Sequence, residues 1–391
     1  MKQIEKIDLL NRVFTPSQPI KQQDLFFGRN IQLRKVVEAI NEYGQHAILY
    51  GERGVGKTSL ANVMLTSFTN IYPVKVTCNR TDNFTSLWKK LFDRVEFSKT
   101  IEGIGFTPQQ HKIITNIGTS LKNIATLTPT DIENIILKLS NMKFLFIFDE
   151  FDNISQENIK EQFADLLKSL SDNVQNVTIL LVGIAENIEE LIGSHNSLER
   201  CIKQIKMPRM SNDEALGIIE NGERILEIKI DDDVKNTILE LSSGFPHYIH
   251  LLCKFGMQEV ILNDKSNFSY AYLNIALKKG VENSNEQLRL SYQKATLDCR
   301  RESKWLEVLH ACALCPGDTF NCFSLQDITV IYNKKTGKSV KGNYISYNIK
   351  HLCESDRGNI LTKVGKGINT KYRFVNPMMR AFIKMKIQSG K

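Results

Sequence analysis

The sequence predicts an α/β fold, a parallel five-stranded sheet with helices on both faces, followed by a helical region and a small C-terminal module. Three observations predict it. Short apolar runs alternate with segments of helical period over residues 46–207, the period is helical alone over 211–293, and shorter basic segments follow. Strands that alternate with helices form parallel sheets, because each helix carries the chain back to the same edge.

The elements of the sheet region follow from the lengths and spacing of the apolar runs. Buried strands are expected where these runs have strand length, at 46–50, 74–78, 144–148, 177–182 and 203–207. Helices are expected where the apolar spacing is helical, at 31–43, 57–68, 83–95, 130–139, 156–170 and 195–201. The first 30 residues show no helical period, and residues 96–129 are less regular, which indicates an insertion.

Length and composition limit the class of protein. A chain of 391 residues has room for two or three domains. Its 42% hydrophobic and 24% charged residues suit a soluble globular protein, and no apolar run approaches the length that spans a membrane. The N-terminus has no apolar signal-peptide core, and eight cysteines spread over so long a chain do not indicate a disulfide framework. We therefore expect a cytoplasmic protein with no membrane partner.

A phosphate-binding loop is predicted between the first strand and the helix that follows it. Residues 51–58 read Gly-Glu-Arg-Gly-Val-Gly-Lys-Thr and fit the pattern G-x-x-x-x-G-K-[ST] in the strand–loop–helix context that this pattern needs. The glycines let backbone N–H groups point at phosphate oxygens, Lys57 reaches the β- and γ-phosphates, and the Thr58 hydroxyl coordinates Mg²⁺. The expected binding residues are Gly51, Glu52, Arg53, Gly54, Val55, Gly56, Lys57, Thr58 and Ser59.

Two carboxylates follow the apolar strand 144–148. Asp149 and Glu150 come at its carboxyl end, at the edge of the sheet where open α/β folds bind ligands. We expect Asp149 to hold Mg²⁺, directly or through water, and Glu150 to act as the general base that activates the attacking water. Asp152 is expected to cap a helix.

These residues resemble those of AAA+ ATPases. The resemblance rests on Phe27-Gly28-Arg29 before the phosphate loop, on Asp149-Glu150-Phe-Asp-Asn, and on the helical region that would form a lid. It covers about residues 20–285 and is strongest to the origin-recognition initiator branch and the related STAND switch ATPases. It implies that Phe27, Gly28 and Arg29 lie near an adenine, and thus that the cofactor is ATP. The chain also lacks the N-K-x-D pattern that reads guanine.

The resemblance implies three further site positions. Glu186 or Asn187, after the strand 177–182, would be the polar sensor that orients water. Arg200 would be an arginine finger that enters a neighbouring protomer's site, although a plain surface arginine at a helix end remains an open alternative. Pro246 would pack near the adenine and His247 would touch phosphate, in a lid segment where a sensor arginine is usual. The missing arginine favours a slow switch.

The C-terminal quarter is predicted to be a winged helix. Helices are expected at 305–314, 324–332 and 339–353, and two strands at 360–363 and 372–375. From residue 301 onward there are 16 lysines and arginines against 6 acidic residues, whereas the whole chain has a net charge of +8. Such a footprint favours DNA as a partner. The candidate contacts are Lys341, Asn343, Tyr347, Lys350, Lys363, Lys366, Lys371 and Arg373.

Other interpretations of this module stay open. Winged helices also mediate protein contacts, and Tyr344 and Tyr347 are spaced to pack together in a core. Cys312, Cys315 and Cys322 have weak zinc-ligand spacing, and buried small hydrophobic side chains are the expected alternative.

The predicted organisation is an N-terminal extension (1–24), an AAA+ nucleotide-binding core (25–207), a helical lid (208–293) and a winged-helix domain (294–391). The expected function is an ATP-hydrolysing switch that self-associates in its ATP state and acts on DNA. A STAND-type signalling ATPase, which oligomerises on sensing a ligand and uses the winged helix for protein contacts, is the alternative. A metabolic kinase with the same loop is less compatible with the lid and the basic tail.

Overall fold

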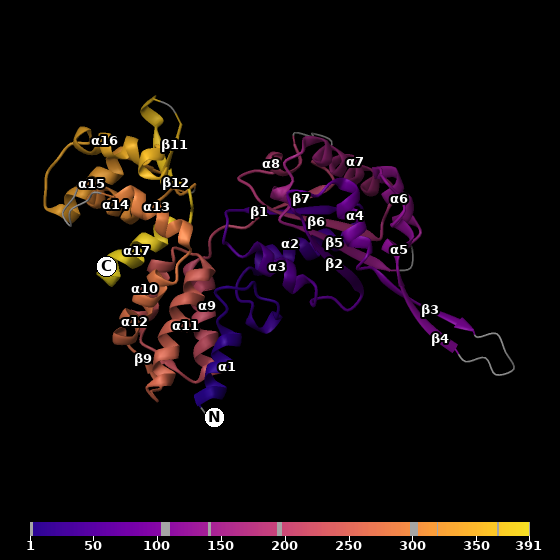
Figure 1. Cartoon of the computed structure of the whole chain (residues 1–391), viewed down its shortest axis with the longest axis horizontal. Coiled ribbons are helices and arrows are strands. Elements are labelled where there is room, and N and C mark those ends of the chain that lie inside the picture. The colour runs from indigo at the N-terminus through magenta and orange to yellow at the C-terminus, as the bar shows by residue number, and fades with distance from the viewer. Residues whose placement is uncertain are drawn as a thin grey trace. The chain divides into compact units, whose positions relative to one another are not determined.

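Figure 1 shows the computed structural model of the chain, which describes residues 3–102, 110–139, 142–193, 198–297, 304–318, 320–365 and 367–390. The chain divides into two compact units. The α/β unit is Gln18–Met210, and the helical unit is Met1–Ser17 together with Ser211–Lys391. Within the described residues, no helix is long and apolar enough to cross a membrane.

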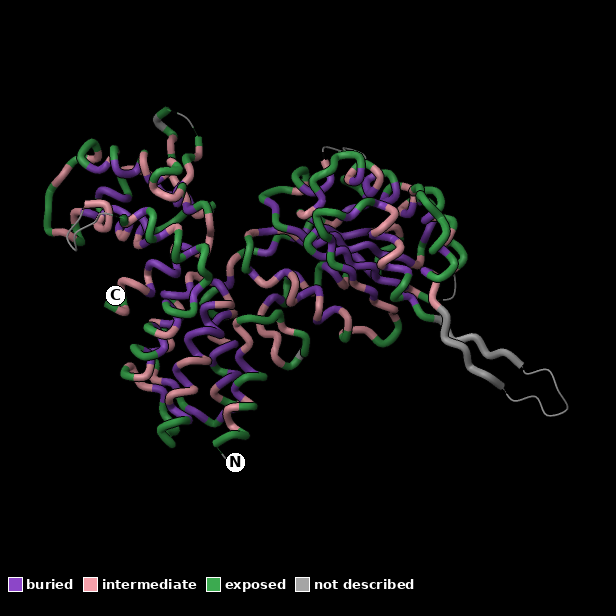
Figure 2. Tube along the Cα trace, viewed as in Figure 1, coloured by how far each residue is buried: buried purple, intermediate pink, exposed green. Residues whose placement is uncertain are grey.

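Five parallel strands form the sheet of the α/β unit and confirm the predicted fold class. In their order across the sheet they are β2 (Ile71–Thr77), β5 (Lys143–Asp149), β6 (Val177–Ile184), β1 (His46–Gly51) and β7 (Ile202–Lys206). The register pairs Thr77 with Asp149 and Gly51 with Ile184, so these strands end at one edge of the sheet. The central strands are buried almost throughout their length (Figure 2).

Helices cover the sheet and anchor β5 through an aromatic cluster. They are α2 (Asn30–Asn41), α3 (Lys57–Met64), α4 (Phe84–Phe92), α5 (Ile117–Leu121), α6 (Pro129–Leu137), α7 (Glu157–Asn173) and α8 (Glu189–Ile192). The fully buried Trp88 of α4 lies with its ring centroid 5.2 Å from that of Phe148 on β5 and 6.2 Å from that of Phe163 on α7. Burial of these large apolar rings fixes β5, and therefore the Asp149 that ends it.

Two predicted segments of this unit differ from the structure. The irregular insertion instead contains an antiparallel hairpin, β3 (Glu96–Glu102) and β4 (Gln110–Asn116), which pairs residue for residue before α5. A two-stranded ribbon of this kind has too little periodic apolar pattern to be recognised in a sequence. The α-helix expected at 195–201 is also wrong where it is described: residue 198 is 3-10-helical and residues 199–201 form a turn, while 194–197 lie outside the described residues.

The helical unit contains the predicted helical region. Its helices are α9 (Asn212–Leu226), α10 (Asp232–Ser242), α11 (Pro246–Leu262), α12 (Tyr270–Glu282) and α13 (Glu286–Thr296). Two short parallel strands, β8 (Lys229–Ile230) and β9 (Asn267–Phe268), join the loops between them. The ten buried residues of α11 make it the central helix, since they include side chains on all its faces.

An N-terminal helix, α1 (Gln3–Val13), also belongs to this unit, so the expectation of no helical segment there is wrong. Only Leu10 and Val13 of α1 are buried, so it carries no apolar stripe that a sequence pattern would show. Its anchor is the next residue, Phe14, which is fully buried. The Phe14 ring fills the space beside Gly222 of α9, where an added Cβ would lie 2.2 Å from the ring.

The C-terminal segment has the three helices and the hairpin that were expected, with two additions. The helices are α14 (Lys304–Leu314), α15 (Leu325–Thr336) and α16 (Asn343–Leu352), followed by the unpredicted α17 (Met379–Ser389). The antiparallel strands β11 (Leu361–Val364) and β12 (Lys371–Phe374) gain a third, β10 (Phe323–Ser324). Cys312, Cys315 and Cys322 are free and buried, in agreement with a packing role.

Replacement of Phe14 by alanine should lower the free energy of unfolding of the helical unit by about 3–5 kcal/mol, because the buried ring leaves a cavity. Ile4→Ala is the control: Ile4 is 76% exposed, so its loss should change that free energy by less than about 0.5 kcal/mol. Urea unfolding followed by Trp305 fluorescence, in a Trp88→Phe background, reports on this unit. Equal midpoints for the two variants would show that Phe14 does not anchor α1.

Candidate nucleotide site

The phosphate loop has the backbone conformation that its glycines were expected to provide. Gly54 and Gly56 have φ of 87° and 99°, and Gly56 directly precedes the first residue of α3. Residues with a side chain rarely adopt such angles. At Gly51, with φ of 150°, an added Cβ would lie 2.4 Å from the Met207 carbonyl oxygen. The nine residues predicted to bind phosphate, 51–59, thus form this loop and the first turn of α3.

Lys57 lies inside the loop rather than in solvent. Its side chain is 7% exposed, and its Nζ donates to the carbonyl oxygens of Gly51 at 2.9 Å and Glu52 at 2.8 Å. Burial lowers the pKa of Lys57 to about 8, although the carboxylates of Asp152, Asp149 and Glu52 oppose this shift. The loop therefore holds a cation with incomplete charge compensation, which an anionic phosphate would supply.

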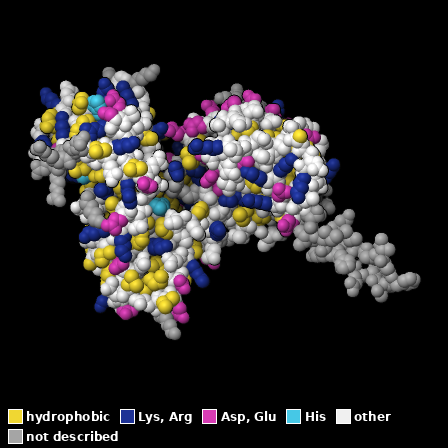
Figure 3. All heavy atoms as spheres, viewed as in Figure 1, with side chains coloured by type: hydrophobic (Ala, Val, Ile, Leu, Met, Phe, Trp, Pro, Cys, Tyr) yellow, Lys and Arg dark blue, Asp and Glu magenta, His cyan; other side chains and the backbone are white. Residues whose placement is uncertain are grey.

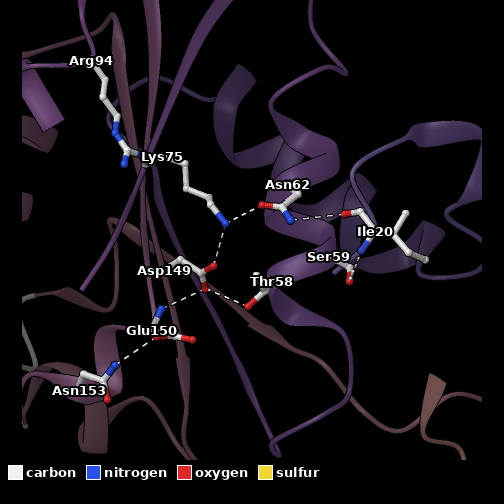
Figure 4. Close-up of polar contacts among 9 residues, drawn as sticks. All are labelled: Ile20, Thr58, Ser59, Asn62, Lys75, Arg94, Asp149, Glu150 and Asn153. Atoms are coloured by element: carbon white, nitrogen blue, oxygen red, sulfur yellow. Dashed lines mark hydrogen bonds and ion pairs between the residues drawn. The ribbon is translucent and has the colours of Figure 1, made fainter. Parts of the chain in front are cut away.

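Asp149 lies at the carboxyl end of β5 and gathers three donors, as Figure 4 shows. Its Oδ1 accepts from the Thr58 hydroxyl at 3.3 Å and from the Glu150 N–H at 3.0 Å. Its Oδ2 accepts from Lys75 Nζ at 2.9 Å. A hydroxyl and a carboxylate side by side are oxygen donors of the kind that Mg²⁺ prefers, so Thr58 and Asp149 fit the predicted metal role.

Glu150 has a left-handed backbone conformation, with φ of 57°. For a residue with a Cβ this conformation costs about 1–2 kcal/mol. The turn Phe151–Asn153 that follows stabilises it, since the Asn153 N–H donates to the Glu150 carbonyl oxygen at 3.0 Å. The Glu150 carboxylate is exposed and accepts from the Asn153 amide at 3.3 Å.

Two residues of this site were not predicted. Asn153 bridges the Glu150 carboxylate and the Cys78 carbonyl oxygen, which its amide reaches at 3.0 Å. Lys75 comes from the neighbouring strand β2 and pairs with Asp149. A lysine between two buried valines gives no sequence signal for this, because the contact depends on which strand lies beside β5. The Asp–Glu–x–x–Asn spacing could have indicated Asn153.

One of the residues that precede the first strand contacts the backbone of the phosphate loop. Arg29 is 1% exposed, precedes α2 as its N-cap in a left-handed conformation, and donates from Nη2 to the Val55 carbonyl oxygen at 2.9 Å. Phe27 and Gly28, half-buried, precede it in the chain. Glu52 of the loop accepts from Arg209 Nε at 2.8 Å. Arg29 thus supports the loop backbone, while its adenine role and that of Phe27 and Gly28 stay predictions.

Three polar residues near the sheet edge have local roles. Asp152 was expected to cap a helix, but this expectation is wrong. Its Oδ1 instead accepts from the Ile184 N–H at 2.8 Å and so holds the end of β6. The Asn187 Oδ1 accepts from the Glu190 N–H in α8 at 3.1 Å, and the Glu186 N–H donates to the Glu190 carboxylate at 3.0 Å. The sensor role suggested for Glu186 or Asn187 stays a prediction.

Arg200 lies at the surface of the α/β unit. Its side chain is 67% exposed and pairs with Asp172 at 2.7 Å. An exposed arginine can reach a neighbouring molecule, and the pair with Asp172 is too exposed to hold it firmly. The arginine-finger role therefore stays a prediction.

In the helical unit, Pro246 begins α11 and His247 follows it in the first turn. The His247 Nδ1 lies 2.8 Å from the Pro16 carbonyl oxygen, and burial lowers the pKa of His247. His247 thus holds the segment that follows α1. The roles proposed for Pro246 and His247 toward adenine and phosphate stay predictions.

Most of the predicted DNA contacts are exposed in the C-terminal segment. Lys341, Asn343, Tyr347, Lys350 and Lys363 are exposed, Arg373 is half-buried, and Lys366 lies outside the described residues. Lys371 is exposed but pairs with Asp318 at 2.7 Å. Tyr344 and Tyr347 are 45% and 62% exposed, so the core-packing alternative for them is wrong. Figure 3 shows lysine, arginine and hydrophobic side chains close together on one face of the C-terminal segment.

Comparisons with known proteins agree with this geometry. Residues 40–192 match the family described as AAA domain. The Walker-type ATPase PABY2304 of Pyrococcus abyssi is 16% identical with a TM-score of 0.54, over 95% of this chain and 99% of that chain. No curated protein matches the chain. The α/β unit therefore has the fold of an AAA-type P-loop nucleoside triphosphatase.

Two further structures are similar over most of their length. The ORC2 protein of Aeropyrum pernix, in ADPNP–ADP complexes, is 15% identical with a TM-score of 0.49, over 97% of this chain and 98% of that chain. The RuvB Holliday junction branch migration motor of Thermotoga maritima is 15% identical with a TM-score of 0.44, over 91% and 94%.

Nucleotide affinity should fall as the pH rises above about 8. Lys57 with a pKa of about 8 begins to lose its proton there, and phosphate binds the charged form, so binding takes up a proton. The dissociation constant of ADP should rise toward about tenfold per pH unit in this range. Calorimetry in two buffers of different ionisation enthalpy measures the proton uptake. A constant affinity and no proton uptake above pH 8 would contradict the lowered pKa.

Proposed function

We propose that this protein is an ATPase that binds ATP with Mg²⁺ at the carboxyl edge of the sheet and hydrolyses it. The observation that carries the proposal is the convergence of Lys57, Thr58, Asp149 and Glu150 at that edge. Each has the chemistry that one part of phosphoryl transfer needs, and they come from two strand ends that only the fold brings together.

The roles follow from the geometry of the chain's own residues. Backbone N–H groups of the loop and the Nζ of Lys57 bind the phosphates, as the ammonium exchanges the carbonyl oxygens of Gly51 and Glu52 for phosphate oxygens. Thr58 and Asp149 would hold Mg²⁺, which would neutralise phosphate charge. The exposed Glu150 carboxylate takes the proton of the attacking water, and the Asn153 amide orients that carboxylate.

We further propose that the output is engagement of DNA by a C-terminal winged helix. Helices α14 to α16 and the three-stranded sheet have the element order of that motif. Asn343, Tyr347 and Lys350 are exposed on α16, and the exposed Lys341 lies just before it. The basic excess of the chain lies in this quarter of the sequence. Exposed lysines neutralise phosphates, while exposed polar and aromatic groups meet bases or backbone.

One observation favours the second function, a signalling ATPase that oligomerises on sensing a ligand. Gly244, with φ of 76°, and Pro246 form the turn that begins α11, and a Gly-x-Pro turn at this place in the lid is typical of STAND proteins. In that case the exposed Tyr344 and Tyr347 would contact protein. Self-association in the ATP state belongs to both proposals, with the exposed Arg200 as the residue that would enter the neighbouring site.

Replacement of Lys57 by alanine should weaken nucleotide binding about 10- to 100-fold, because a charged hydrogen-bond donor to phosphate is lost. Glu150→Gln should keep binding and lower turnover by about 10²- to 10⁴-fold, since only the proton acceptor is removed. Phosphate release and fluorescent ATP binding measure the two effects. Lys35→Ala, an exposed lysine on α2, is the control. Unchanged turnover in Glu150→Gln would reject Glu150 as the base.

Duplex DNA should bind with an affinity that falls steeply with salt, because lysines displace counterions from its phosphates. The double variant Lys341→Ala/Lys350→Ala should reduce the slope of log K against log salt by about 1.8 if both lysines contact phosphate. Lys138→Ala/Lys168→Ala, a pair of exposed lysines on the α/β unit, makes the same charge change and should leave the slope unaltered. Equal slopes for both double variants, or assembly on ATP without DNA affinity, would favour the signalling function. Fluorescence anisotropy is the measurement.

A further inference from the structure

A half-buried lysine contacts the carboxylate that is proposed to hold the metal. Lys75, on β2, pairs with Asp149 through a contact of 2.9 Å, and the two side chains are 14% and 3% exposed. Figure 4 shows that this ammonium approaches Asp149 on the oxygen that faces away from Thr58. Within the described residues, Asp149 therefore has an internal cation on one oxygen and the proposed metal partner Thr58 on the other.

The position of Lys75 is fixed by a network from a second element. The Asn62 Oδ1, on α3, accepts from Lys75 Nζ at 2.6 Å. The Asn62 amide in turn donates to the Ile20 carbonyl oxygen at 3.5 Å, while the Ile20 N–H donates to the Ser59 hydroxyl at 3.2 Å. Arg94 donates to the Lys75 carbonyl oxygen and holds the strand backbone. The ammonium is thus positioned by α3 and by the segment before α2.

This arrangement sets a lysine and a divalent cation against the same carboxylate. A cation bound at Thr58 and Asp149 would be separated from the Lys75 ammonium only by the Asp149 carboxylate. Repulsion between the two positive charges is strong where water is largely excluded. The ammonium also takes hydrogen-bonding capacity from Asp149 that a metal or a metal-bound water would use. Asn62 offers the ammonium a second partner, so Lys75 can loosen from Asp149 without becoming unpaired.

We propose that Lys75 is a positioning residue that competes with Mg²⁺ for Asp149 and so weakens the coupling between metal and nucleotide. The proposal rests on the proposed nucleotide site. Its consequence is a protein that binds nucleotide with little help from metal and releases metal readily. Without Lys75, the single charge of Asp149 would be available to the metal, and Mg²⁺ would tighten nucleotide binding more strongly.

The full-length chain and its variants test this by nucleotide binding rather than turnover. The dissociation constant of N-methylanthraniloyl-ADP is measured in EDTA and in saturating Mg²⁺. The metal coupling is the constant in EDTA divided by the constant in Mg²⁺, so a larger ratio means that Mg²⁺ tightens binding more. Lys75→Met, which removes the charge but keeps the apolar stem, should raise this ratio by about tenfold or more. Lys75→Gln, which keeps a donor for Asp149, should act in the same direction and serves if the methionine variant does not fold.

Two controls separate the charge of Lys75 from its packing. Lys75→Arg keeps a cation and should keep the coupling of the parent chain. Lys90→Met removes a lysine from another buried aspartate of the same unit, Asp82, which it contacts at 2.6 Å, and should leave the coupling unchanged. An unchanged or lowered ratio in both neutral variants would overturn the role of Lys75. Loss of Lys57-dependent binding in the parent chain would instead reject the nucleotide site itself.

Discussion

The contact between Thr58 and Asp149 is the constraint on which the site depends. These residues are 91 positions apart in the sequence, and their side chains meet at 3.3 Å because β1 and β5 run parallel and end at one edge. The hydrogen bond itself contributes little to stability in net terms. What holds the two ends in place is the buried sheet and the aromatic cluster around Trp88, which fix β5 against α4 and α7. The positions of Thr58 and Asp149 therefore depend on the packing of the buried core.

The site also concentrates buried charge. Lys57 and Asp149 are buried and Lys75 is half-buried, and each finds its partners within the same unit. Desolvated ions are costly unless they are paired, so an arrangement of this kind needs a ligand or a network to retain it. Here carbonyl oxygens hold one lysine and an amide and a carboxylate hold the other. A nucleotide phosphate could replace the carbonyl oxygens around Lys57, whereas a metal would compete with Lys75 for Asp149.

The phosphate loop and the acidic strand end could be predicted because their signals are local. Gly54 and Gly56 have backbone angles that few other residues adopt. Asp149 follows an apolar strand, and in a parallel sheet the residue after a strand lies at the edge where ligands bind. The contact of Lys75 with Asp149 could not be predicted, because it depends on β2 lying beside β5. No short sequence motif determines the order of strands in a sheet. The helix α1 was missed for a related reason: its anchor, Phe14, meets Gly222 far along the chain.

The left-handed backbone of Glu150 has a consequence for how this sequence can change. Glycine would adopt that angle without a steric cost, and asparagine nearly so, whereas glutamate is held there by the turn that follows. Selection for thermal stability alone would therefore favour replacement of the residue that is proposed to take a proton from water. Glutamate at this position is therefore a compromise, in which some stability of the fold is given up to place one carboxylate at the edge of the sheet.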